Sequence, residues 1–190
     1  MEQKTITVVS GLPRSGTSMM MKMLEAGGIA PLTDKLREAD KDNPKGYYEF
    51  ERVKQLEHDK AWLPDAEGKA VKIISQLLKH LPATYAYKVI FMRRSMEEIL
   101  ASQEKMLIRR GEEAKGIEDE KLAALFRQHL ERVQAWLEKQ PNFDVIYVSY
   151  NRVLEHPRQQ ARRVDAFLDR ELDVLAMAQV VDPTLYRQRG

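Results

Sequence analysis

An eight-residue loop near the N-terminus carries the residue types best suited to binding a phosphate. Residues 11–18 read GLPRSGTS, after a β-branched strand candidate at 5–10 and before the helix-forming segment MMMKMLEAGG at 19–28. Between a strand and a helix, successive backbone N–H groups and the positive end of the helix dipole form an anion nest. Gly16 lets the backbone approach a ligand closely, and Thr17 and Ser18 add hydroxyl donors. The loop is therefore predicted to hold a phosphate group.

The loop departs from the Walker A pattern of ATPases and kinases in one decisive position. Thr17 stands where that pattern has lysine, and the loop's cation is Arg14, two residues before the second glycine. ATPases and kinases use the missing lysine on the β- and γ-phosphates. We expect a phosphate-binding loop without standard nucleoside triphosphate chemistry.

A second anion-binding pair is predicted at the end of a later strand. Arg94 follows the strand candidate at 87–92, and Ser102 comes eight residues after it. Ser95 and Glu98 fit a capping box, which starts a helix at this point. Ser102 then lies seven residues beyond the cap, close to the same helix face, so Arg94 and Ser102 could converge on one anion.

These two patterns together resemble the sulfotransferase family. The family's 5′-phosphosulfate loop follows P-[KR]-S-G-T-[TS], which is matched by Pro13, Arg14, Ser15, Gly16, Thr17 and Ser18. Its 3′-phosphate site uses a strand-end arginine and a serine eight residues later, matched by Arg94 and Ser102. Tyr150 occupies the place of a Tyr-Glu pair beside the adenine, although Asn151 replaces the glutamate. The resemblance implies the donor 3′-phosphoadenosine 5′-phosphosulfate (PAPS), the product 3′-phosphoadenosine 5′-phosphate (PAP), and no required metal.

The resemblance also implies roles in sulfuryl transfer. Arg14 would act on the leaving-group side, and Lys72, a charge within the apolar run at 70–74, would lie near the transferred sulfate. Glu49 is our first choice for the base, because it follows the only loop long enough to reach over the phosphates; His58 is the alternative.

Two arginines at the end of the sequence, Arg187 and Arg189, could replace the basic stretch that closes over the 3′-phosphate elsewhere in the family. A frayed terminus is the competing interpretation.

Strand and helix candidates alternate along the chain. Strands are expected at 5–10, 70–74, 87–92 and 144–148, and helices at 19–28, 50–62, 95–110, 122–139, 155–168 and 172–180. Residues 31–48 and 109–121 are expected to be loops. Alternation predicts an α/β, three-layer P-loop nucleotide-binding fold with a central parallel sheet flanked by helices. We expect residues 1–190 to form a single sulfotransferase-like domain.

The amino-acid composition limits the classes of molecule that the protein is expected to bind. The 190 residues contain 31 Lys and Arg against 29 Asp and Glu, so the sequence lacks the excess of basic residues that is typical of proteins that bind nucleic acids. It contains no cysteine, which excludes disulfides and thiol chemistry. The N-terminal segment lacks an apolar signal-peptide core, so we expect a cytoplasmic protein that binds neither nucleic acid nor membrane. The long helix at 122–139 could pair with a copy of itself in a homodimer.

The acceptor is not readable from the sequence and could be a small molecule, a peptide or a carbohydrate. Two other functions stay open: an atypical P-loop kinase or NTP hydrolase, and a non-catalytic nucleotide-binding module. Ligand preference, magnesium dependence and turnover separate the three.

Overall fold

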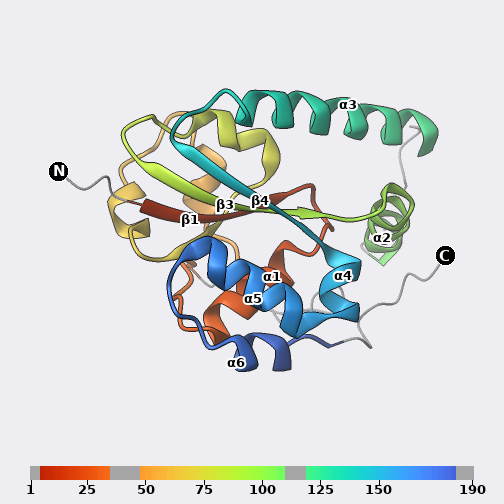
Figure 1. Ribbon diagram of the computed structural model, residues 1–190. Coiled ribbons are helices and arrows are strands. Elements are labelled where there is room, and N and C mark those ends of the chain that lie inside the picture. Colours follow the sequence, from red (N-terminus) through yellow and green to blue (C-terminus); the bar gives the residue numbers. More distant parts are fainter. Residues whose placement is uncertain (1–4, 35–47, 110–118, 183–190) are drawn as a thin grey trace.

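Four parallel strands form the centre of the molecule. The computed structural model describes residues 5–34, 48–109 and 119–182. Its strands are β1 (Thr5–Gly11), β2 (Ala70–Lys72), β3 (Ala86–Arg93) and β4 (Phe143–Ser149), in the order β2-β1-β3-β4 (Figure 1). Gly11 pairs with Met92 and Arg93 pairs with Ser149, so β1, β3 and β4 end along the same edge. The predicted parallel sheet is confirmed.

Helices cover both faces of this sheet. On one face lie α1 (Thr17–Ala26), α4 (Tyr150–Glu155), α5 (Pro157–Leu168) and α6 (Val174–Gln179), around a core that includes Val9, Ile90 and Met92. On the other face lie α3 (Asp119–Leu137) and the 3-10 helices η1 (Glu51–Gln55), η2 (Leu63–Ala66) and η3 (Ser75–His80). Helix α2 (Met96–Arg109) follows β3 at the edge where the strands end (Figure 1). The three-layer architecture is therefore as expected.

The strands are buried because their side chains point alternately into two apolar layers, one on each face of the sheet. In β1, Val9 packs into the α1-side core and Val8 into the α3-side core. Successive side chains of a strand point to opposite faces, and both faces are covered, which is why residues 5–10 are almost wholly apolar.

The segment 50–62 differs from the helix predicted for it. Only residues 51–55 are helical, and they form the short 3-10 helix η1. Val53 and Leu56 are buried three residues apart, a spacing that a 3-10 turn satisfies as well as an α-helix. Trp62 is fully buried, and its indole N–H donates to the carbonyl of Asp59 at 3.1 Å, which fixes the chain as a turn.

Smaller differences have local causes. The helix expected at 155–168 is α5, which begins at Pro157. A separate short helix that was not expected, α4, precedes it, and the two are divided at His156 because the residue before Pro157 is disfavoured in the α conformation. Strand β2 stops at Lys72, two residues earlier than expected, although the Ile73 N–H still donates to the carbonyl of Val9. Helix α3 begins at Asp119, inside the segment expected to be a loop.

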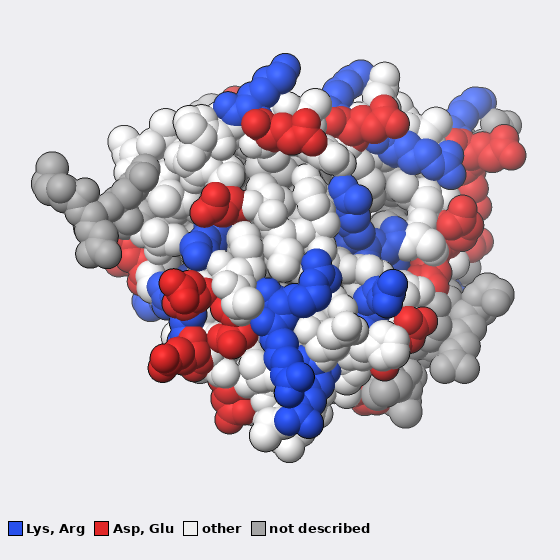
Figure 2. Space-filling model, in the orientation of Figure 1, with Lys and Arg blue, Asp and Glu red and all other residues white. Residues whose placement is uncertain are grey.

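Charge is distributed unevenly over the surface. On the face shown in Figure 2, Lys and Arg side chains gather over α4 and α5, whereas acidic and basic side chains both occur along α3. Among the helices of the described residues, none combines the length and apolarity that a membrane span requires.

Candidate active site

The predicted phosphate loop is a tight turn between β1 and α1. Both the backbone N–H and the hydroxyl of Ser15 donate to the carbonyl of Leu12, at 3.2 and 2.7 Å. Gly16 is the N-cap of α1 and provides no side-chain cap, and no acidic residue lies in the first turn. The first N–H groups of a helix lack intrahelical partners, so the N-terminus of α1 could bind an anion.

Gly16 is required by its surroundings as well as by its backbone. Its φ of 98° lies in the left-handed region, and a β-carbon there would lie 2.4 Å from Cδ2 of Tyr150. The turn is thus pressed directly against the ring that begins α4. Arg14 also has a positive φ, of 69°.

The two predicted anion sites meet at this turn. Arg14 Nε donates to Ser102 Oγ at 2.9 Å, and Arg94 Nη1 donates to the carbonyl of Arg14 at 3.1 Å. The Arg94 guanidinium lies 4.3 Å from the centre of the Tyr150 ring. Arg14, Arg94, Ser102 and Tyr150 therefore form one group beside the loop, here called the arginine cluster.

A buried carboxylate belongs to the same cluster and was not predicted. Glu98 Oε2 accepts from Arg94 Nε at 2.9 Å, and the other oxygen accepts from Asn151 Nδ2 at 3.1 Å. The side chains of Arg94 and Glu98 are only 7% and 10% exposed. One carboxylate oxygen of Glu98 thus binds the Arg94 guanidinium, and the other accepts a hydrogen bond from the Asn151 amide.

The charged groups of the arginine cluster also act on the pKa of the Tyr150 hydroxyl. Burial raises the pKa of its hydroxyl, the Arg94 and Arg14 guanidinium groups oppose that rise, and Glu98 adds to it. At neutral pH the hydroxyl is protonated and able to donate a hydrogen bond.

Glu49 and Lys72 are brought together at the end of β2. Lys72 Nζ lies 3.8 Å from Glu49 Oε1, with side-chain exposures of 11% and 23%. Lys72 pairs with Val9 of β1, two residues before the loop. The backbone carbonyl of Glu49 accepts from Thr33 Oγ1 at 2.7 Å, which ties this segment to residues 33–34.

The remaining predicted site residues are placed as follows. His58 is 78% exposed and has Glu57 as its neighbour, at 3.9 Å. Pro13 is exposed, whereas Thr17 and Ser18 are half-buried in the first turn of α1. Arg187 and Arg189 lie outside the described residues.

A histidine that the sequence did not single out lies on the other face. His129 of α3 has its Nε2 2.8 Å from the Oγ of buried Ser75, which follows β2. Burial lowers the pKa of His129, and the nearby Arg132 lowers it further. Within residues 5–34, 48–109 and 119–182, no three His, Asp or Glu side chains are grouped to hold a metal ion.

A comparison with known protein families shows which family this chain belongs to. The family model described as the sulfotransferase domain matches residues 4–187. The chain belongs to the sulfotransferase family. Among curated proteins, none matches significantly.

Solved sulfotransferase structures share the fold at low sequence identity. The sulfotransferase domain of the Synechococcus PCC 7002 olefin synthase is 16% identical with a TM-score of 0.60, covering 98% of this chain and 84% of that one. A sulfotransferase from Mycobacterium tuberculosis H37Rv is 20% identical with a TM-score of 0.64, covering 98% and 74%. The sulfotransferase domain from the curacin biosynthetic pathway is 14% identical with a TM-score of 0.55, covering 96% and 79%.

Proposed function

We propose that this sulfotransferase moves a sulfuryl group from PAPS to the hydroxyl or amine of an acceptor. The observation that carries the donor assignment is the arginine cluster. Two separate sequence patterns, one for a 5′-phosphosulfate and one for a 3′-phosphate, lie within hydrogen-bonding contact of each other through Arg14, Arg94 and Ser102. A nucleotide that carries phosphate at both positions fits such a pair of sites.

The residues present suit the two ends of that nucleotide. The N-terminus of α1, with no acidic residue in its first turn, would hold the 5′-phosphosulfate. The guanidinium of Arg94 and the hydroxyl of Ser102 would hold the 3′-phosphate, and the Tyr150 ring would lie beside the adenine.

In the transfer, the acceptor oxygen or nitrogen forms a bond to sulfur while the bond from sulfur to the 5′-phosphate oxygen breaks. The phosphate oxygen keeps the electron pair, and Arg14 would stabilise that charge. Glu49 would take the acceptor's proton, and Lys72, at 3.8 Å from it, would face the transferred group.

The donor is tested by ligand-dependent thermal stability. We expect PAP to raise the melting temperature by much more than the same concentration of AMP does, because only PAP has a 3′-phosphate that the arginine cluster could bind. A ligand at 100 times its Kd stabilises the native state by about 2.7 kcal/mol. ATP with magnesium is the second comparison. Stabilisation by ATP and magnesium alone would indicate a P-loop kinase or NTP hydrolase, and PAP binding without any turnover would indicate a nucleotide-binding module.

The base assignment is tested by two matched substitutions. Glu49→Gln should lower kcat by about 10²–10⁴ because a positioned base contributes that much, while PAP affinity stays unchanged. His58→Asn, at a side chain that is 78% exposed, should leave kcat unchanged. Steady-state kinetics with a saturating donor measure both. Full turnover in Glu49→Gln would remove this residue from the mechanism, and a loss confined to His58→Asn would replace it.

A further inference from the structure

The segment that follows α1 lies alongside β2, the strand at one edge of the sheet. The N–H of Ala70 donates to the carbonyl of Ala30 at 3.0 Å, and the N–H of Leu32 donates to the carbonyl of Ala70 at 2.8 Å. The two segments run parallel to each other. Residues 33–34 therefore continue along the edge of the sheet towards Lys72, the last residue of β2.

Residues 33–34 hold the backbone of the segment that contains Glu49. Thr33 Oγ1 donates to the carbonyl of Glu49 at 2.7 Å, and the N–H of Asp34 donates to the same carbonyl at 3.4 Å. The N–H of Glu51 donates to Asp34 Oδ2 at 2.6 Å. Glu51 begins η1, whose N-cap residue Phe50 makes no side-chain hydrogen bond to the helix. The first N–H groups of a helix need such a partner, and the Asp34 carboxylate supplies it.

The two side chains that flank Glu49 are anchored in different layers of the core. Tyr48 packs against the core on the α1 side, and its hydroxyl donates to Glu25 Oε2 of α1 at 2.5 Å. Burial, and then the Glu25 carboxylate, raises the pKa of this hydroxyl, which stays protonated and able to donate. Phe50 packs against the core on the α3 side, with its ring centre 5.4 Å from that of fully buried Trp62. Glu49 thus lies between two anchored neighbours.

We propose that Asp34 is a positioning residue for the proposed base Glu49, and that Tyr48 assists it from the side of α1. The proposal rests on the proposed function, in which Glu49 takes the acceptor's proton. A general base must lie within hydrogen-bonding reach of the proton that it removes. A displacement of about 1 Å can lower the rate by about 100-fold, so the contacts that fix the backbone of Glu49 bear directly on its role.

The same contacts refer the base to the elements that would hold the donor. Tyr48 is bonded to α1, whose N-terminus is the proposed site of the 5′-phosphosulfate. Lys72, at 3.8 Å from the Glu49 carboxylate, pairs with Val9 of β1, just before the phosphate loop. Base and donor would therefore be positioned by the same two elements, β1 and α1.

The test measures PAP formation at saturating PAPS, with water as the acceptor and with 2-naphthol added as a probe acceptor. We expect Asp34→Ala to lower kcat by roughly 10- to 100-fold and to leave the Kd of PAP unchanged. Asp34→Asn should stay close to the wild-type rate, because its amide oxygen can still accept from the Glu51 N–H. Tyr48→Phe should cause a smaller loss, of roughly 2- to 10-fold, because it removes one hydrogen bond and keeps the ring.

Asp165→Ala is the matched control for stability. Asp165 Oδ1 accepts from the backbone N–H of Leu172 at 2.7 Å, a half-buried contact of the same kind in the layer of α5. Both alanine variants should be destabilised to a similar extent in urea denaturation, but only Asp34→Ala should lose kcat. An equal loss of kcat in Asp165→Ala would overturn the positioning role.

A double-mutant cycle with Glu49→Gln separates this proposal from the proposed function. If Asp34 acts through Glu49, adding Asp34→Ala to Glu49→Gln should change kcat by less than about twofold, since no base is left to misplace. Losses that multiply in the double variant would overturn the positioning role alone. Full turnover in Glu49→Gln would instead remove the base itself, and a wild type that forms no PAP with either acceptor would overturn the proposed function.

Discussion

Arg94→Ala should weaken PAP binding strongly and destabilise the protein at the same time. The guanidinium is the proposed ligand of the 3′-phosphate, and losing one bidentate charged contact costs roughly 100-fold in affinity. Removal of one partner of a buried ion pair typically costs about 3–5 kcal/mol, and Glu98, only 10% exposed, would lose its cationic partner. Isothermal titration with PAP and urea denaturation measure the two effects.

The double variant Arg94→Ala/Glu98→Gln separates binding from stability. Glu98→Gln removes the carboxylate charge that Arg94→Ala leaves without its partner, so most of the lost stability should return while PAP binding stays weak. Arg93→Gln is the matched control for nucleotide binding, because the neighbouring guanidinium points to the other face and should leave PAP affinity unchanged. Recovery of PAP affinity in the double variant would contradict the role of Arg94.

The parts of the fold that were predictable depend on local signals. A β-branched run at 5–10, two glycines around a turn and a helix-forming segment are enough to indicate a strand, a phosphate loop and a helix in that order. The spacing of Arg94 and Ser102 is equally local, since both lie near the Ser95 cap, and the N–H of Glu98 does bond to Ser95 Oγ at 3.3 Å.

The carboxylate of Glu98 shows where local reasoning stops. A capping-box glutamate reaches back to the N–H of the cap residue, yet this one bonds to Arg94 and Asn151. Asn151 lies 53 residues away in the sequence, and only the packing of α4 beside α2 brings it close. Asn151 replaces the glutamate of the family's Tyr-Glu pair; in the structure, its amide donates a hydrogen bond to the Glu98 carboxylate of α2.

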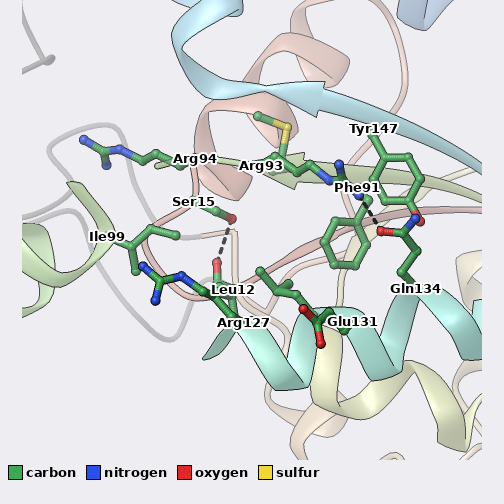
Figure 3. Close-up of a pocket in the computed structure, with 12 residues that line it drawn as sticks. Leu12, Ser15, Phe91, Arg93, Arg94, Ile99, Arg127, Glu131, Gln134 and Tyr147 are labelled. Carbon is green, nitrogen blue, oxygen red and sulfur yellow. Dashed lines mark hydrogen bonds between the residues drawn. The ribbon is translucent and has the colours of Figure 1, made fainter. Parts of the chain in front are cut away.

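A cavity beside α3, lined by Leu12, Arg94 and Arg127 among others, was beyond prediction for a related reason (Figure 3). Its existence depends on how far α3 sits from the ends of β3 and β4, which is set by side-chain packing between distant segments. Arg93 ends β3 and Arg94 follows it directly, but their ring partners Tyr147 and Tyr150 come from β4 and α4.

Gly16→Ala should abolish PAP binding, whereas Gly28→Ala should not. Both glycines have a left-handed φ, 98° and 106°, so each alanine carries a backbone cost of roughly 1–2 kcal/mol. A β-carbon on Gly28 would meet nothing within 4 Å, but one on Gly16 would lie 2.4 Å from the Tyr150 ring. Gly16→Ala should therefore be the less stable variant by a further 1–3 kcal/mol or so, the usual cost of overpacking.

The difference between these two variants isolates the contact from the backbone effect. Tyr150 cannot move freely, because the Arg94 guanidinium lies 4.3 Å from its ring centre and Arg94 in turn donates to the carbonyl of Arg14. Displacing the ring or the turn thus disturbs the helix end and the arginine cluster together, and both phosphate sites should fail in Gly16→Ala. Equal melting temperatures and equal PAP affinities for the two alanine variants would mean that the loop is not held against α4 in solution.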